Sequence, residues 1–214
     1  MENYPLFVAE ELLNTGAFKI SFEPLFTWTS GIKSPVYCDL RALISNVNTR
    51  RVIVEAFQKL YPVISDADVI AGTATAGIPW AAWLAEALGK PMVYVRSAAK
   101  EHGTKKRIEG ELAPGMKVVL VEDHISTGGS SISAVEALRT EGQATVDVIV
   151  AINTYEMSKA DTAFAEAKIQ IRTITNFTTI LSAARAKSTI TPEQETALLE
   201  FRNDPASWAG KQGL

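Results

Sequence analysis

The sequence predicts an α/β fold, with a mainly parallel central sheet flanked by helices and a small N-terminal α+β subdomain. From Asn48 onward, short apolar segments alternate with amphipathic helical segments, the order typical of βαβ units. The run VVLV at 118–121 offers apolar side chains to both faces, which indicates a central strand covered by helices on each side. Because the rhythm changes before Asn48, we predict two parts, an N-terminal subdomain over 1–46 and a core over 47–214.

Bulk composition narrows the class of protein. The 214 residues are 47% hydrophobic, which suits a folded domain rather than a disordered chain. A formal net charge of −3 gives no general attraction to nucleic acid or to an anionic membrane, so neither is an expected partner. The single cysteine, Cys38, and two histidines without CxxC or HExxH spacing argue against a zinc site. No apolar run approaches the roughly 20 residues of a membrane span, and we expect a cytoplasmic protein.

The N-terminal elements are justified by their caps and alternation. Asn3 is a suitable N-cap for the first helix, and Gly16 a suitable end. FKISF at 18–22 alternates apolar and polar residues, as expected of a half-buried strand, and SPVYCDL at 34–40 is its predicted hairpin partner.

The core elements follow in alternation. Amphipathic patterns predict helices at 48–62, 78–89, 131–142 and 191–201. Apolar runs predict strands at 68–72, 91–96, 117–123, 144–152 and 169–175, the last of them at an edge of the sheet. Thr191 and Gln194 have the spacing of a capping box at the start of the last helix.

One segment breaks this alternation. Residues 97–115, SAAKEHGTKKRIEGELAPG, show no sustained periodicity and are rich in Gly, Lys and Glu. Because a loop this long inside a compact domain is usually either functional or disordered, we predict a mobile loop that covers a site. The alternative is a solvated, charged hairpin.

The residues that follow the central strand carry the strongest chemical signal. In an open parallel sheet, ligands bind beyond the carboxyl ends of the strands. Gly128 and Gly129 let a ligand approach the backbone, and the helix that follows offers unpaired N–H groups to a phosphate. Glu122 and Asp123 only accept hydrogen bonds when ionised, and they would repel a nearby phosphate unless they face another group. Sugar hydroxyls or a divalent cation would fit them. A phosphorylated ribose meets both demands, whereas the alternative is an ordinary β-turn-α connection with capping serines.

A second strand-to-helix connection is a weaker anion site. GTATAG at 72–77 has two glycines at P-loop spacing, but Ile78 and Pro79 stand where a P-loop needs Lys and Ser or Thr. GxGxxG, the dinucleotide fingerprint, does not occur in the sequence. The backbone N–H groups of 72–77 remain candidates for a second anion.

Taken together, these motifs resemble a known family. VVLVEDHISTGGSS at 118–131 resembles the phosphoribosyl diphosphate (PRPP) signature of type I phosphoribosyltransferases. FTWTSGIKSPVYCDLR at 26–41, VRSAAKEHG at 95–103 and TNFTT at 175–179 are similar to segments of the orotate phosphoribosyltransferase family. The resemblance spans nearly the whole chain.

The resemblance implies a fold, a reaction and partners. It implies the type I phosphoribosyltransferase fold and the conversion of orotate and PRPP to orotidine 5′-monophosphate and pyrophosphate, a step of UMP biosynthesis. Mg²⁺ would be the cofactor and would be carried by PRPP, without a set of protein ligands of its own. The family also implies a homodimer in which each subunit's loop covers its partner's active site.

Residue roles follow from the same resemblance. Arg96, Lys100 and His102 fall on catalytic positions, where positive charge would stabilise the departing diphosphate. Ser126 falls on a position that contacts orotate. The implied PRPP-binding residues are Arg96, Lys100, His102, Glu122, Asp123, His124, Ile125, Ser126, Thr127, Gly128, Gly129 and Ser130. Within that set, His124 is interpreted as a packing position beside the acids.

Some positions depart from the family pattern and leave alternatives open. Thr29 stands where many members have Lys, and an orotate-binding Arg is replaced near Thr154. Lys33 is a candidate partner for the orotate carboxylate, with a solvated turn lysine as the alternative. The alternative functions are a purine or uracil phosphoribosyltransferase and a PRPP-sensing regulator.

Overall fold

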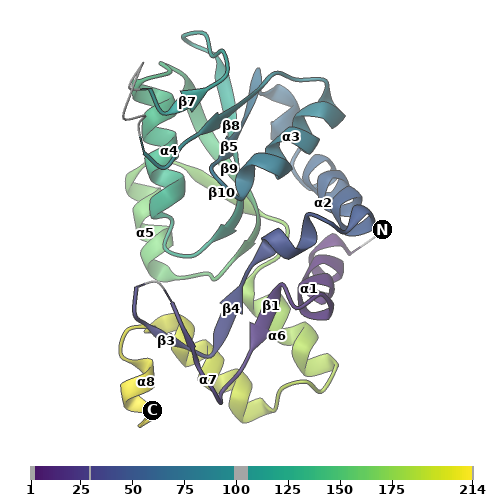
Figure 1. Cartoon of the computed structure of the whole chain (residues 1–214), viewed down its shortest axis with the longest axis vertical. Helices are drawn as coiled ribbons and strands as arrows, with labels where there is room; N and C mark the ends of the chain where they lie inside the picture. Colours follow the sequence, from purple (N-terminus) through teal and green to yellow (C-terminus); the bar gives the residue numbers. More distant parts are fainter. Residues whose placement is uncertain (1–2, 29, 99–105, 214) are drawn as a thin grey trace.

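A computed structural model describes residues 3–28, 30–98 and 106–213. Its centre is a six-stranded sheet in the order β10-β9-β8-β5-β6-β7, in which only the β6–β7 pair is antiparallel among the described strands (Figure 1). In that order the strands are β10 (Gln170–Thr173), β9 (Thr145–Thr154), β8 (Lys117–Ile125), β5 (Val69–Thr73), β6 (Met92–Val95) and β7 (Ile108–Glu109). The predicted α/β class with a mainly parallel sheet is confirmed.

The central strand β8 is buried on both faces. Val119 and Val121 belong to the apolar cluster on one side of the sheet, and Val118 and Leu120 belong to the cluster on the other. On the first side lie α2 (Val47–Leu60) and α3 (Gly77–Leu88), and on the second lie α4 (Gly129–Thr140) and α5 (Ser158–Glu166) (Figure 1). This alternation explains the unbroken apolar run in the sequence.

The N-terminal segment forms a second, smaller group of strands. Helix α1 (Tyr4–Asn14) begins at the predicted N-cap, where the side chain of Asn3 accepts a hydrogen bond from the Leu6 N–H at 3.3 Å. Strands β1 (Phe18–Ile20) and β4 (Val36–Cys38) pair antiparallel, as predicted. Between them, β2 (Phe26–Thr27) and β3 (Lys33–Ser34) form a short hairpin of their own, whereas the predicted strand at 34–40 joined the end of β3 to β4.

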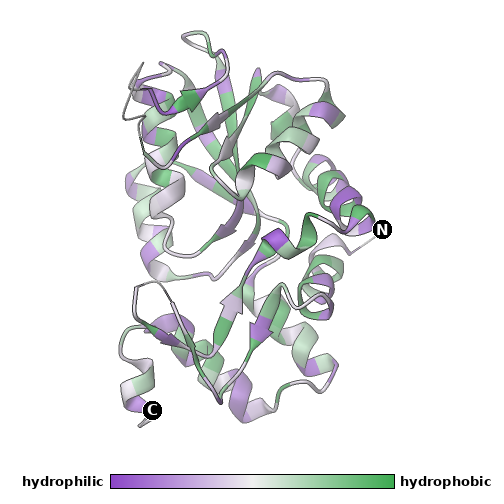
Figure 2. Cartoon of the chain, viewed as in Figure 1, coloured by the Kyte–Doolittle hydropathy of each residue, from purple (hydrophilic) through white to green (hydrophobic). Residues whose placement is uncertain are grey.

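The C-terminal helices pack against this N-terminal group rather than against the large sheet (Figure 1). The helices are α6 (Phe177–Ala186), α7 (Pro192–Asn203) and α8 (Trp208–Lys211). The ring of Phe18 lies 6.0 Å from that of Phe177, and Phe22 lies 6.4 Å from Trp208. Buried apolar residues of α1 and α6 belong to one cluster, and Figure 2 shows hydrophobic residues in both helices. The division of the chain at residues 46 and 47 therefore stays a prediction.

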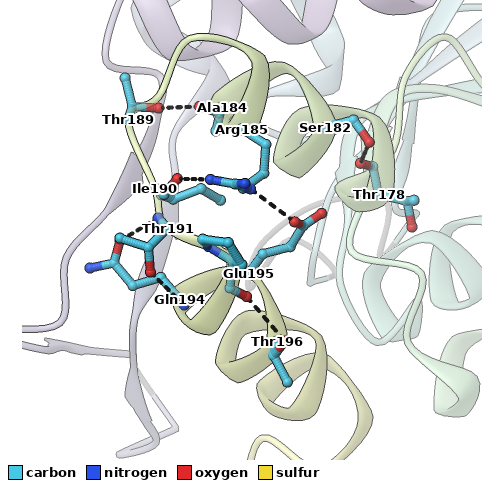
Figure 3. Close-up of polar contacts among 11 residues, drawn as sticks. Thr178, Ser182, Ala184, Arg185, Thr189, Ile190, Thr191, Gln194, Glu195 and Thr196 are labelled. Atoms are coloured by element: carbon cyan, nitrogen blue, oxygen red, sulfur yellow. Dashed lines mark hydrogen bonds and ion pairs between the residues drawn. The ribbon is translucent and has the colours of Figure 1, made fainter.

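Polar contacts join α6 to α7 (Figure 3). The Arg185 guanidinium donates to the Ile190 carbonyl at 2.6 Å and pairs with Glu195 at 3.2 Å. Both hydrogen bonds of the predicted capping box are present, because Thr191 Oγ1 accepts from Gln194 N–H at 3.2 Å and Gln194 Oε1 accepts from Thr191 N–H at 2.9 Å. These contacts fix the angle at which the chain enters α7.

The structure differs from the predicted elements in three places. Strand β8 continues to Ile125, because His124 and Ile125 still pair with β9. The far end of the predicted loop 97–115 folds as β7, which extends the sheet beside β6. Helices α5, α6 and α8 were not predicted. Among the described residues, no helix is long and apolar enough to cross a membrane.

Candidate active site

Glu122 and Asp123, near the end of the central strand β8, lie at the carboxyl edge of the sheet, against the start of α4. Glu122 is 5% exposed. Its Oε2 accepts hydrogen bonds from Ser131 Oγ at 3.0 Å and from Ser130 Oγ at 3.4 Å, and its Oε1 accepts from the Asp123 N–H at 3.2 Å. These two serines therefore bind the Glu122 carboxyl group in this structure, and Asp123 lies close enough to Cys38 and Asp39 of the N-terminal segment for their charges to interact.

Burial makes this acid pair electrostatically costly. Burial first, and then the charge of Asp123, raises the pKa of Glu122 well above its ordinary value. Burial also raises the pKa of Asp123, a hydrogen bond with the Glu122 side chain opposes this rise, and the negative charge of Asp39 adds to it. Two carboxyl groups in such a site are difficult to ionise together. A ligand that donates hydroxyl groups, or carries a cation, would relieve that cost.

The turn that follows the acids leaves backbone open to a ligand. Gly128 has φ +80°, and a Cβ at this position would lie 2.6 Å from the Phe164 ring, so both conformation and space require glycine. No side chain caps the start of α4, where Gly128 is the N-cap. A Cβ at Gly129 would meet nothing within 4 Å. The first N–H groups of α4 can therefore bind a phosphate.

The connection after β5 has glycines for a different reason. A Cβ at Gly77 would lie 2.6 Å from the carbonyl oxygen of Val121, and one at Gly72 would lie 3.0 Å from the Cβ of Ala81. Both glycines let α3 pack closely against β5 and β8. The Ala74–Thr75 peptide bond between them is cis.

A cavity of about 110 Å³ lies between this connection and α4. Its lining residues are Thr73, Ala74, Val95, Arg96, Ser97, Arg107, Ser130 and Ser133. The Oγ1 of Thr73 is buried and has no hydrogen-bond partner within the described part of the chain. Two guanidinium groups and several hydroxyls thus line a space large enough for a phosphate group. Arg96 also pairs with Glu109 at 3.5 Å.

Above the acids, the end of β4 contacts the ends of β8 and β9. Asn153 Nδ2 lies 3.8 Å from Cys38 Sγ and 3.2 Å from His124 Nδ1. The His124 ring meets the Tyr155 ring edge-on at 4.2 Å, and Tyr155 stacks on Trp28 at 5.5 Å. Burial lowers the pKa of His124 to about 3, so the imidazole is neutral at physiological pH. This agrees with its interpretation as a packing residue.

Sequence reasoning missed Asn153 and Tyr155. Each is a single residue at the end of a strand, and nothing in the local pattern marks it as a neighbour of Cys38 or of Trp28. Asn153 is fully buried, and its Oδ1 has no hydrogen-bond partner in the described ranges. Burial, followed by the charge of Asp123, raises the pKa of the Cys38 thiol, which makes this cysteine unreactive.

Comparison with known proteins identifies the family. The sequence model of the phosphoribosyl transferase domain matches residues 46–181. An Enterococcus faecalis protein named orotate phosphoribosyltransferase is 46% identical over 202 residues, covering 94% of this chain and 96% of the relative. One of the same name from Bacteroides thetaiotaomicron is 45% identical over 213 residues, covering 99% and 100%. The chain belongs to the orotate phosphoribosyltransferase family.

Solved structures agree with this assignment. The crystal structure of orotate phosphoribosyltransferase from Aeropyrum pernix has a TM-score of 0.75 and 30% identity, and the match covers 84% of this chain and 98% of that one. Leishmania donovani UMP synthase has a TM-score of 0.78 and 26% identity, over 92% of this chain and 42% of that one. The fold is that of the type I phosphoribosyltransferases.

Within this family's site, the predicted residues are only partly brought together. Glu122, Asp123 and the 126–130 turn lie at one edge of the sheet with Arg96 nearby. Lys100 and His102 lie outside the described residues, so their catalytic roles stay predictions. The Nζ of Lys33 donates to Thr27 Oγ1 at 2.9 Å within the β2–β3 hairpin, a contact that favours a turn lysine over a carboxylate ligand.

The acids also fit a magnesium ion that arrives with a phosphorylated substrate. Within 3–28, 30–98 and 106–213, no three His, Cys, Asp or Glu side chains form a group that could hold a metal ion. Mg²⁺ commonly keeps several waters and is bound by one or two carboxylates together with substrate phosphates. Glu122 and Asp123 provide carboxylates of that kind beside an open helix start.

Proposed function

We propose that this chain transfers the phosphoribosyl group of PRPP to orotate, giving orotidine 5′-monophosphate and pyrophosphate in pyrimidine biosynthesis. The observation that carries the proposal is the pairing of two adjacent acids, Glu122 buried and Asp123 half-buried, with an uncapped helix start at the end of β8. One end of this site suits ribose hydroxyls and the other suits a phosphate. The family to which the chain belongs supplies the reaction.

PRPP would lie across the carboxyl edge of the sheet. The backbone of 127–130 would bind the 5-phosphate, and Glu122 and Asp123 would accept hydrogen bonds from the ribose hydroxyls. The diphosphate would occupy the cavity of about 110 Å³ that Arg96 lines. His124 and Ile125 belong to β8 itself, so their contribution to PRPP binding would come through the shape of the strand end.

The chemistry requires positioning and positive charge rather than a protein nucleophile. Displacement of pyrophosphate from the ribose passes through a cationic sugar while negative charge gathers on the leaving group. Arg96, Lys100 and His102 would stabilise that charge, and His102 would donate a proton to pyrophosphate, a role that suits histidine because an unperturbed imidazole titrates near neutrality. Mg²⁺, when carried by PRPP, would neutralise part of the diphosphate. Closure of the 97–115 segment would keep water from the activated sugar.

Orotate would lie between Ser126 and the end of β4. Ser126 is half-buried at the turn beside the acids. We further propose a cytoplasmic homodimer in which each subunit's loop covers the partner's site. Neither nucleic acid nor a membrane is an expected partner, because the net charge of −3 offers no electrostatic attraction to either.

Substrate specificity tests the proposal directly. Pyrophosphate release from PRPP should require orotate, and uracil or hypoxanthine should not replace it. Release with uracil or hypoxanthine instead would favour the purine or uracil alternative, and PRPP binding without any release would favour the regulator.

A second experiment tests the loop and its sharing between subunits. Lys100→Ala should lower turnover by roughly 10²-fold or more with an unchanged melting temperature, whereas Lys159→Ala on α5 should change neither. Mixing Lys100→Ala subunits with Asp123→Ala subunits should restore activity if loops are shared across the dimer. Hybrids that stay inactive would contradict the shared site.

A further inference from the structure

Arg107 closes the end of the β6–β7 ladder in an unusual way. The Arg96 N–H donates to the Arg107 carbonyl at 2.9 Å, as expected of antiparallel partners. The reciprocal backbone bond is replaced, because the Arg107 N–H donates to Glu141 Oε2 at 2.8 Å. The Arg107 side chain turns back instead, and its Nε donates to the Arg96 carbonyl at 2.9 Å. One residue thus satisfies both backbone groups of Arg96.

The other arm of the same guanidinium reaches helix α4. Arg107 Nη1 donates to the carbonyl and to the Oγ of Ser133, both at 3.0 Å. Ser133 and Arg96 line the cavity of about 110 Å³, together with the unpartnered hydroxyl of Thr73. Arg107 therefore bridges two walls of the space assigned to the diphosphate.

These contacts show that Arg107 is not simply a solvated basic residue at the surface. Arg107 is half-buried, although in the sequence it belongs to the cluster KKR of the charged 97–115 segment. A comparable bridge exists elsewhere on α4, where Arg139 donates to the carbonyls of Ala167 at 2.9 Å and Val146 at 2.5 Å. The Arg139 bridge joins backbone remote from the cavity. The two bridges differ in their partners, because Arg107 contacts Arg96 and Ser133, which line the cavity, whereas the partners of Arg139 do not line it.

We infer that Arg107 is a positioning residue that holds Arg96 against α4, so that the Arg96 guanidinium faces the diphosphate of PRPP. The inference rests on the proposed function. A planar guanidinium can donate in two directions at once, whereas an ammonium group cannot hold both partners in this geometry. Without the bridge, the end of β6 and Arg96 lose their fixed distance from α4, and misplacement of this kind weakens a charge contact strongly.

The test compares Arg107→Gln and Arg107→Lys with Arg139→Gln as the matched control. We expect both Arg107 variants to raise KM for PRPP, and the dissociation constant for inorganic pyrophosphate, by about 10-fold or more, with KM for orotate changed less than twofold. Arg139→Gln should leave these constants unchanged while lowering the melting temperature at least as much as Arg107→Gln does. Arg107→Lys with wild-type constants would overturn the inference, since charge alone would then suffice.

A double-mutant cycle with Arg96→Gln decides how Arg107 acts. If Arg107 works through Arg96, the double variant should bind pyrophosphate no more weakly than Arg96→Gln alone. Additive losses would overturn the inference and place Arg107 in direct contact with the diphosphate. Equal constants for Arg107→Gln and Arg139→Gln would also overturn it. In either case a wild-type protein active with orotate keeps the proposed function, whereas an inactive wild type refutes that function first.

Discussion

The connections after β5 and after β8 are both short strand-to-helix turns with two glycines, but their glycines serve different purposes. Gly77 sits where any Cβ would strike the Val121 carbonyl, so packing of α3 requires it. At Gly129 a Cβ would meet nothing, and the space beyond it is open. The first connection is set by the fold, and the second leaves room for a ligand. A glycine motif alone does not distinguish these cases.

The charges of the two connections differ in the same sense. The 72–77 turn has no ionisable side chain, whereas the turn after β8 follows two acids whose pKa values burial raises. The fold does not need the acid pair, and the cost of burying two adjacent carboxyl groups lowers the stability of the ligand-free protein. This difference predicts that substitutions at the two acids and in the glycine turn that follows them reduce activity and can raise stability. Substitutions of the glycines in the 72–77 connection should instead reduce stability.

The largest expected effect concerns Asp123. Asp123→Asn should lower kcat/KM for PRPP by roughly 10²-fold or more, because a carboxylate contact with the ribose is lost at the reacting sugar. Its unfolding free energy should not fall, because a neutral amide replaces a carboxyl group whose ionisation is opposed by burial and by the charge of Asp39. Asp147→Asn, an exposed acid on β9, is the matched control and should change neither quantity. Normal kcat/KM in Asp123→Asn would break the comparison.

The next effect separates the two glycines. Gly77→Ala should destabilise the fold by about 3 kcal/mol, because backbone must shift to admit the methyl group. Gly129→Ala should keep or slightly raise stability, since glycine in a helix is unfavourable, but it should weaken PRPP binding where the methyl meets the phosphate. Urea unfolding and PRPP titration of both variants measure this. A destabilised Gly129→Ala with normal PRPP affinity would reverse the assignment.

A smaller effect comes from His124. Its folded pKa, lowered to about 3 by burial, lies below the unfolded value near 6.5. The stability it contributes is therefore present above pH 6.5 and is lost as pH falls toward 3. Between pH 7 and pH 5, wild type should lose about 2 kcal/mol more than His124→Gln does. Parallel unfolding free energies for the two proteins over that range would show that the imidazole takes up protons freely.

The smallest effect comes from Glu122, whose contribution to stability changes with pH in the direction opposite to that of His124. The pKa of Glu122 is higher in the folded protein than in the unfolded chain. Its contribution to the free energy of unfolding is therefore fully present below the unfolded pKa and is lost as the pH rises through the folded pKa. Glu122→Gln cannot ionise and should gain about 1 kcal/mol or more over wild type between pH 5 and pH 7. Denaturant midpoints at the two pH values check this. A gain that is the same at both would mean that the acid ionises without cost.

Much of this arrangement could be predicted from local sequence. The alternation after Asn48, the apolar run of β8 and the capping box at Thr191 each have a periodic or fixed-spacing signal, and the structure contains all three. Helix α6 was missed, although Asn176 is its N-cap and accepts from the Thr179 N–H at 2.8 Å. The TNFTT segment offers few strong helix formers there, so tertiary packing decides.

The sequence by itself determined the alternation of the main strands and helices after Asn48, the acids near the end of β8 and the glycines that follow them, because each depends on neighbours within a few residues. Only the tertiary structure decided that α6–α8 complete the N-terminal group, that Asn153 joins Cys38 to His124, and that Arg107 bridges Arg96 to α4. These partners lie far apart along the chain, up to 115 positions between Cys38 and Asn153. Contacts at that separation depend on how whole elements pack, and no local periodicity encodes them.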